Sequence, residues 1–203
     1  MRFSRSDLMD VFTRFSIETP TVELRPVLNR DALEFARMFN ADGGDFQKYT
    51  FNRTDEQVLD FGPSMAKYFM AHLKQHDEEI DAVSLYVVRK QQGRPFIGRL
   101  RIWQDSENRP RIAPYLIPSQ RGQGALTQLY EKVIGRGYAA GLFPDRKVVA
   151  EVPVENTAAQ KFLISHEFKV SGAARPLQLV DDPKNGVMVL PLERELVLKR
   201  SMG

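Results

Sequence analysis

The sequence predicts a single α/β domain, in which a mixed, mainly antiparallel sheet is flanked by helices on both faces. Three observations favour this class. A chain of 203 residues with 42% hydrophobic and 27% charged residues suits one globular domain with a sizeable core. Two β-rich segments, 82–89 and 96–103, are joined by a short glycine-containing turn, which is typical of a hairpin. The second half alternates strand-like and helix-like segments twice, as strand–helix–strand crossings do.

The composition excludes several classes of function. The chain has no cysteine, which excludes disulfide scaffolds, thiolate zinc sites, iron–sulfur clusters and cysteine nucleophiles. His72 and His76 are one helical turn apart without an evident third ligand, so we expect no metal. The net charge of +3 is too small to indicate a nucleic-acid partner. Because we find no apolar signal core and no run of about 18 apolar residues, we expect a cytoplasmic protein without membrane contact.

Residues 1–20 are interpreted as a helical appendage to a main domain of residues 21–203. Apolar residues recur at helical spacing from Leu8, Ser6 can cap the helix, and Pro20 marks the end of the segment. Two interpretations remain open. The helix packs on its own domain, or it is an arm exchanged between two copies, which predicts a homodimer.

The first elements of the main domain follow from local patterns. Residues 22–27 predict a strand, and an amphipathic helix entered through Asn29 follows it. Residues 54–57 match a capping box and predict the start of another helix. After a break at Gly62 and Pro63, Ser64 can cap a second helical segment. One face of that segment collects Met65, Tyr68, Phe69 and Leu73.

The second half supplies the crossings. Residues 112–117 predict a strand, and a helix of about 14 residues follows the next loop. The apolar stripe of this helix consists of Leu126, Leu129, Tyr130, Val133 and Ile134. Residues 148–154 predict the next strand, and Asn156 caps a short helix. Residues 168–170 and 187–197 supply the last strands.

The segment from Ile117 to Ala125 is the most informative one, because it runs from a strand into a helix. Gly122 and Gly124 let the backbone approach a ligand closely, and the N–H groups of the first helical turn favour an anion. Arg121 can add a charge-assisted hydrogen bond. The loop matches neither the P-loop nor the dinucleotide-binding glycine pattern. It is therefore either an anion site or ordinary turn chemistry.

The same loop resembles that of a known family. Residues 121–124 read Arg-Gly-Gln-Gly, which is similar to the pyrophosphate loop of the GNAT superfamily of N-acetyltransferases. Residues 150–159 resemble a stretch of the ribosomal-protein N-terminal acetyltransferase branch of that superfamily. Residues 160–168 are similar to the ending of that stretch, and the whole resemblance spans residues 22–198.

Four positions depart from the family pattern. Leu126 stands where the loop usually has glycine or alanine, and Glu167 replaces the glycine before Phe168. Leu163 stands where many members have a tyrosine general acid. Residues 112–115 lack the glutamate that often stands at this part of the central strand. The general acid and the base are therefore not identified by the resemblance.

The resemblance implies a GNAT-like fold and the transfer of an acetyl group from acetyl-CoA to a primary amine by direct attack. The residues that would hold the diphosphate of the cofactor are Arg121, Gly122, Gln123, Gly124 and Ala125. A strand opened near Leu116 and Ile117 would offer a backbone N–H to the thioester carbonyl. Asn156 either hydrogen-bonds the pantetheine arm or simply caps its helix.

Glu151 is the candidate base for the amine, because a carboxylate inside an otherwise apolar strand is expected to have a perturbed pKa. The alternative is a strand carboxylate that reaches solvent or an arginine. Asp105 and Glu107 are weaker candidates, with solvated turn residues as their alternative.

A second hypothesis belongs to another class: a non-catalytic protein of the same fold that binds CoA, a protein partner or nucleic acid. The departures from the family pattern favour it. A nucleic-acid surface would use the arginines on neighbouring strands, Arg99, Arg101, Arg109 and Arg111. The acceptor stays open, because a protein N-terminus, a small amine, an aminoglycoside and a polyamine all fit the sequence.

Overall fold

The computed structural model confirms the predicted fold class. It describes residues 3–14, 16–41, 62–90, 93–105, 107–143, 146–176 and 188–196. The described strands are β1 (Ile17–Glu18), β2 (Val22–Arg25), β3 (Val83–Arg89), β4 (Phe96–Gln104), β5 (Pro110–Leu116), β6 (Lys147–Pro153), β7 (Lys169–Val170), β8 (Arg175–Pro176) and β9 (Met188–Glu195). They form one sheet in the order β1-β2-β3-β4-β5-β6-β9-β7, and β8 also pairs with β9. The pairings are antiparallel except that of β5 with β6.

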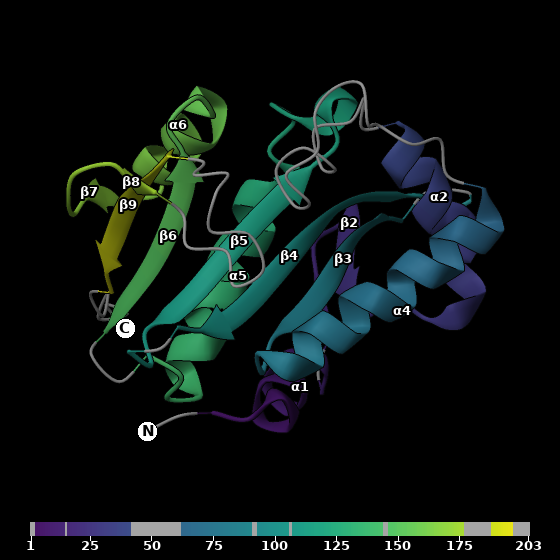
Figure 1. The fold of residues 1–203 in the computed structure, drawn as a ribbon, viewed down its shortest axis with the longest axis horizontal. Coiled ribbons are helices and arrows are strands. Elements are labelled where there is room, and N and C mark those ends of the chain that lie inside the picture. The colour runs from purple at the N-terminus through teal and green to yellow at the C-terminus, as the bar shows by residue number, and fades with distance from the viewer. Residues whose placement is uncertain are drawn as a thin grey trace.

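Helices cover both faces of this sheet. The described helices are α1 (Arg5–Thr13), α2 (Ala32–Asn40), α4 (Pro63–Glu79), α5 (Ala125–Ala139) and α6 (Thr157–Ser165), with short 3-10 turns at Asn29–Asp31 and Pro118–Gln120. Figure 1 shows α2 and α4 on one face, where they enclose an aromatic core around Phe35 and Phe69. On the other face α1 and α5 pack against a larger aliphatic core. The central strands are thus packed on both sides, and α4 and α5 lie on opposite faces of the sheet.

The predicted stripe of α5 is confirmed. All five of its apolar residues are buried, and Leu129, Tyr130 and Val133 are fully inaccessible. Residues repeated at intervals of three and four fall on one side of a helix, so this pattern by itself identifies the face that meets the sheet.

The prediction for α1 is wrong in its cap. Ser4, not Ser6, is the N-cap: its hydroxyl accepts from the Asp7 N–H, and the Asp7 carboxylate accepts from the Ser4 N–H. An acidic residue three positions later completes a capping box for Ser4, whereas Ser6 would have Met9 there. The helix ends at Thr13 because the chain next forms β1, which pairs with β2.

The N-terminal helix packs within its own chain. Leu8 and Phe12 are each only 2% exposed and belong to the larger core. The buried side of α1 is therefore occupied by its own domain. The homodimer stays a prediction.

The predicted apolar face of α4 is wrong in part. The helix begins at Pro63 with Gly62 as its N-cap, so Ser64 lies inside it. Met65 and Tyr68 are exposed, and the buried side consists of Ala66, Phe69, Met70, Leu73 and Asp77. The pattern favoured the bulky aromatic Tyr68 over the small Ala66, but Ala66 is fully buried and Tyr68 is 67% exposed. The capping box of residues 54–57 lies outside the described residues.

None of the helices in the described part of the chain combines the length and the apolarity needed to span a membrane. Within the same residues, no three histidine, aspartate or glutamate side chains gather as a metal ion would require.

Candidate functional site

The parallel strands β5 and β6 diverge in the middle of the sheet. Their register consists of one pair, Arg111 opposite Val149, near the start of both strands. Beyond this pair β5 continues along β4 as far as Leu116, and β6 continues along β9 as far as Pro153. Figure 1 shows the two strands separating towards their carboxyl ends. Ligands of open α/β sheets bind at the carboxyl ends of strands, where neighbouring strands part.

The end of β5 presents a backbone donor to this opening. Ile117 donates its N–H to the Ile97 carbonyl on β4 at 3.0 Å. Successive N–H groups point to opposite sides of an antiparallel strand, so the Leu116 N–H points away from β4 and towards the diverging β6. Pro114, which has no N–H, faces the same side, as expected of proline at an unpaired edge. Of the two predicted positions, the geometry therefore leaves Leu116 as the donor.

The loop after β5 contains two glycines in the left-handed backbone conformation. Gly122 and Gly124 have φ values of 74° and 71°, which side-chain-bearing residues rarely adopt, and a Cβ on either would meet nothing within 4 Å. Gly124 is the N-cap of α5 and offers no side-chain acceptor, so the first-turn N–H groups are left for a ligand. The side chains of Ala125 and Leu126 are buried in the larger core. The leucine that departs from the family pattern therefore adds no bulk to the open side of the loop.

Two arginines hold this loop. Arg121 turns back and donates through Nε to the Leu116 carbonyl at 2.9 Å, which ties the loop to the end of β5. Arg89, at the end of β3, donates to the side chains of Gln120 and Gln123. Sequence reasoning missed Arg89, because it lies 31 residues before Gln120 on a strand that is not a neighbour of β5.

Asn156 is confirmed as the cap of α6. Its Oδ1 accepts from the Ala159 N–H at 3.1 Å, and α6 begins directly after β6. The side chain of Gln160 closes the same turn by donating to the carbonyls of Pro153 and Val154. Asn156 therefore lies beside the opening, as a contact with the pantetheine arm would require. That contact stays a prediction.

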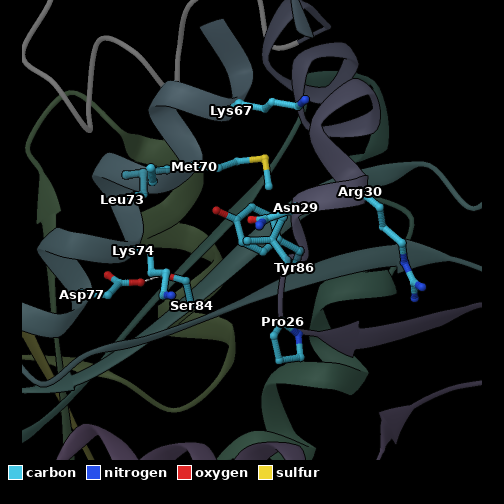
Figure 2. Close-up of a pocket in the computed structure, with 12 residues that line it drawn as sticks. Pro26, Asn29, Arg30, Lys67, Met70, Leu73, Lys74, Asp77, Ser84 and Tyr86 are labelled. Atoms are coloured by element: carbon cyan, nitrogen blue, oxygen red, sulfur yellow. Dashed lines mark hydrogen bonds between the residues drawn. The ribbon is translucent and has the colours of Figure 1, made fainter. Parts of the chain in front are cut away.

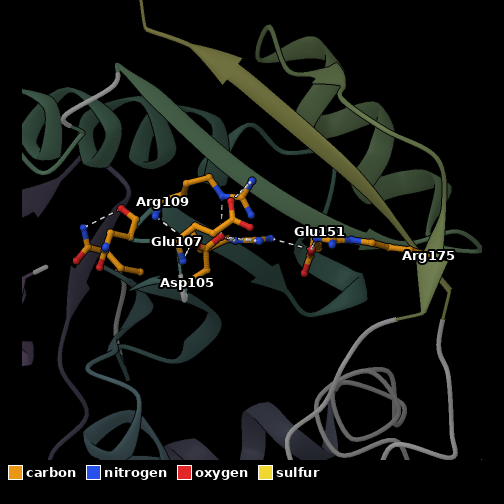
Figure 3. Close-up of polar contacts among 8 residues, drawn as sticks. Asp105, Glu107, Arg109, Glu151 and Arg175 are labelled. Carbon is orange, nitrogen blue, oxygen red and sulfur yellow. Dashed lines mark hydrogen bonds and ion pairs between the residues drawn. The ribbon is translucent and has the colours of Figure 1, made fainter. Parts of the chain in front are cut away.

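Glu151 is held by two arginines (Figure 3). Its Oε1 lies 2.6 Å from Nη2 of Arg175 and 3.1 Å from Nη1 of Arg111. While these contacts hold, that oxygen is not available to take a proton from an amine. The arrangement favours the alternative interpretation, a strand carboxylate paired with arginine, and the catalytic role of Glu151 stays a prediction.

The other two acidic candidates differ in their surroundings. Asp105 is largely buried, and its Oδ2 accepts from Arg109 and Arg111 at 2.7–2.9 Å (Figure 3). Burial alone would raise the pKa of Asp105, but the Arg109 backbone N–H and the Arg111 guanidinium outweigh it and hold the pKa below its usual value. Asp105 is thus an anchor for the strand ends and not a solvated turn residue. Glu107 is exposed, as expected for a solvated turn residue.

The sheet face beneath α4 carries buried charges. Asp77 of α4 lies 2.9 Å from Nε of Arg101 and 3.5 Å from Nη2 of Arg99, and its Oδ2 accepts from the Ser84 hydroxyl at 2.5 Å. Arg99 and Arg111 are only 4% and 5% exposed. These two arginines therefore do not form the nucleic-acid surface that the second hypothesis considered.

A cavity of about 650 Å³ opens between α4 and β3 on this face (Figure 2). Tyr86 forms part of its floor, and burial raises the pKa of Tyr86 to about 12, so its hydroxyl stays protonated. Tyr86 on β3 pairs with Arg99 on β4, and Arg99 pairs with Tyr115 on β5. Tyr86 is therefore two strand spacings, or about 10 Å, from β5. None of the predicted cofactor residues lines this cavity, so it is separate from the opening between β5 and β6.

Comparison with solved structures places this arrangement in a known fold. The microcin self-immunity acetyltransferase MccE, in complex with acetyl-CoA and AMP, is 14% identical, with 88% of this chain and 94% of that chain covered and a TM-score of 0.68. The ribosomal acetyltransferase RimL, in complex with coenzyme A, is 14% identical, with coverages of 90% and 98% and a TM-score of 0.69. A ribosomal-protein alanine acetyltransferase from Vibrio fischeri is 18% identical, with coverages of 89% and 96% and a TM-score of 0.65. At these identities the likeness shows the fold alone.

The family itself is shown by the sequence. A search of the curated proteins finds no match. The family model of the acetyltransferase (GNAT) domain matches residues 21–169, a range that contains the diverging strands and the glycine loop between β5 and α5. The chain therefore belongs to the GNAT acetyltransferase family.

Proposed function

We propose that this protein transfers the acetyl group of acetyl-CoA to a primary amine by direct attack. One observation carries the proposal: the loop with the two positive-φ glycines, Gly122 and Gly124, lies at the carboxyl end of β5, where β5 and β6 part. A ligand with a diphosphate at one end and a thioester at the other would use both features at once. Bound CoA compounds in MccE and RimL, which share the fold, support this choice of cofactor.

The described residues fit acetyl-CoA, whose thioester supplies an activated acyl group. The loop of residues 121–125 and the first turn of α5 bind the diphosphate through backbone N–H groups. The Leu116 N–H stabilises the negative charge that develops on the carbonyl oxygen. Asn156 borders the path between them, at the start of α6. These roles divide the cofactor between the loop and the opening.

The transfer balances without a covalent enzyme intermediate. The neutral amine attacks the carbonyl carbon, a C–N bond forms, the C–S bond breaks, and sulfur leaves with the electron pair. The proton released by the nitrogen passes through water to the sulfur and yields a free thiol. Because the chain has no cysteine, a cysteine acyl-enzyme is excluded.

The charges near the site favour an acceptor with a single amine, such as a protein N-terminus or a small monoamine. Two acidic side chains described around β5 and β6 are Asp105 and Glu151. Each of them is already paired with arginine. A polyamine or an aminoglycoside would need carboxylates that are free to bind its other cations.

Thermal unfolding with and without acetyl-CoA tests the cofactor. At about 100 times Kd the ligand contributes about 2.7 kcal/mol, which for a domain of this size raises Tm by about 5–11 °C. Arg121→Glu removes most of the shift, because it reverses a charge at the loop and breaks the tie to Leu116. Arg14→Glu, a charge reversal on the exposed end of α1, leaves the shift intact. Absence of any shift in the wild type refutes the cofactor assignment.

Release of CoA thiol with a panel of N-terminal peptides and small amines tests the reaction. We expect turnover with at least one monoamine class. Tight acetyl-CoA binding without turnover on any amine would refute the enzyme and leave the second hypothesis, a non-catalytic protein of this fold.

A further inference from the structure

Arg89 links the end of β3 to both ends of the glycine loop. Its Nε and Nη2 lie 3.1 and 2.7 Å from Oε1 of Gln120, and Nη2 also lies 2.5 Å from Oε1 of Gln123. Gln120 ends the 3-10 turn that follows β5, and Gln123 stands between the two glycines of positive φ. The guanidinium thus contacts the loop on either side of Arg121 and Gly122.

These contacts also fix how the two amides are turned. A guanidinium only donates hydrogen bonds, so both glutamines present their oxygens to Arg89. The Nε2 of Gln123 then donates to the Ser119 carbonyl at 3.0 Å. The Nε2 of Gln120 has no acceptor among the described residues, and it is left as a donor at the loop. Donors and a fixed positive charge are what a diphosphate requires of its surroundings.

The glycines make an external hold necessary. Gly122 and Gly124 have no side chains that could anchor the loop, and even an added Cβ would meet no atom within 4 Å. Glycine also loses more conformational entropy on ordering than any other residue. A loop that is ordered before the ligand arrives does not lose that entropy on binding, so its affinity is higher. Arginine suits this task because its planar fork reaches two acceptors at once, whereas a lysine ammonium is a single point charge.

We propose that Arg89 is a positioning residue for the diphosphate of acetyl-CoA, which acts by holding Gln120 and Gln123 and by adding a fixed positive charge behind the loop. The inference rests on the proposed function, because it assumes that the loop binds the diphosphate. It assigns Arg89 no contact with the acetyl group. The effect of its removal is therefore confined to ligands that carry a diphosphate.

The test compares two ligands by isothermal titration calorimetry on the full chain: acetyl-CoA, and acetyl-pantetheine, which has no diphosphate. Arg89→Met raises the Kd of acetyl-CoA about 10-fold or more, as expected when hydrogen bonds to a charged group are lost. The Kd of acetyl-pantetheine changes less than about two-fold, because it does not use the loop. In steady-state kinetics the same variant raises KM for acetyl-CoA and leaves kcat unchanged.

Two further variants separate positioning from general effects. Arg94→Met removes the same charge from the turn that follows β3, where Arg94 is exposed and paired with Glu23, and it leaves acetyl-CoA binding unchanged. Gln123→Leu weakens acetyl-CoA binding by less than Arg89→Met, because Arg89 still holds Gln120 and keeps its charge. The double variant is no weaker than Arg89→Met alone, because Gln123 is held through the same guanidinium. Gln123 is exposed, so this arm stays informative even if Arg89→Met fails to fold.

The outcomes are distinct. A wild type that does not bind acetyl-CoA refutes the proposed function. A wild type that binds, with an Arg89→Met variant that binds acetyl-CoA equally well or loses both ligands in parallel, overturns the role of Arg89 alone. Additive effects of Arg89→Met and Gln123→Leu overturn it as well.

Discussion

Replacing Asp77 by asparagine removes the carboxylate on which the polar cluster beneath α4 depends. The Asp77 side chain is 6% exposed and lies within 3.5 Å of both Arg99 and Arg101. Two guanidinium groups thus share one carboxylate. Burial and the neighbouring Arg99 already lower the pKa of Arg101 to about 10, which shows that the positive charge there is costly. An asparagine side chain has the shape of the aspartate but would leave both cations without their buried counter-charge.

The expected cost follows from this geometry. Breaking a buried ion pair by neutralising one partner costs about 3–5 kcal/mol, because the remaining charge stays desolvated. The Ser84 hydroxyl retains an acceptor in the amide, so the loss is electrostatic in the main. For a chain of about 200 residues, each kcal/mol lowers Tm by about 2–4 °C, which gives a fall of about 6–20 °C.

Thermal and urea unfolding, followed by circular dichroism, measure this loss. Glu78→Gln is the matched control: the next carboxylate along α4 is half exposed, and it lies 3.6 Å from Arg5 and 3.9 Å from Lys74. It should cost less than about 1 kcal/mol. Adding Arg101→Met to Asp77→Asn should recover part of the stability, since one buried charge is removed. A loss below about 1 kcal/mol for Asp77→Asn, or no recovery in the double variant, would refute the electrostatic account.

Three further outcomes are expected. Tyr130→Phe leaves Tm unchanged or raises it by the equivalent of about 1 kcal/mol, because the fully buried hydroxyl has no hydrogen-bond partner among the described residues; a clear loss of Tm would reveal one. The hydrogen bonds from Arg25 outweigh the burial of Asp31 and lower the pKa of its carboxyl group. The wild type is therefore more stable than Asp31→Asn by its full margin above about pH 4, and the margin declines at lower pH. A margin that stays constant down to about pH 2 contradicts this. Glu151→Gln lowers kcat less than about ten-fold, and a larger loss in a folded variant would establish Glu151 as the base.

Sequence patterns formed by residues close together in the chain predicted the local structure correctly. The stripe of α5 is buried, Asn156 caps α6, and the glycines of the loop have the backbone conformation that only glycine adopts readily. Each of these features depends on residues within one or two turns of one another. Periodicity, capping and left-handed backbone are local in their physics, so the sequence alone contains them.

Competing local signals could not be resolved in the same way. Both Ser4 and Ser6 are residue types that can cap α1. In the structure Ser4 is the N-cap and forms a capping box with Asp7, and Leu8 and Phe12 are buried in the core. Along α4, Tyr68 and Ala66 are both plausible for the buried side. The folded structure buries Ala66 in the aromatic core that α4 shares with α2 and leaves Tyr68 exposed.

The sequence by itself determined the fold class, the family resemblance and the glycine loop that would bind an anion. The tertiary structure decided which charges meet: Arg89 with Gln120 and Gln123, and Glu151 with Arg111 and Arg175. Glu151, Arg111 and Arg175 lie on three different strands, and Arg89 lies on β3, which is not a neighbour of the β5 that leads into the loop, so these pairings depend on strand order and register. A one-residue slip of a strand would send every side chain to the opposite face. Hydrophobic pattern specifies which face is buried, but only the assembled sheet specifies which polar groups lie side by side.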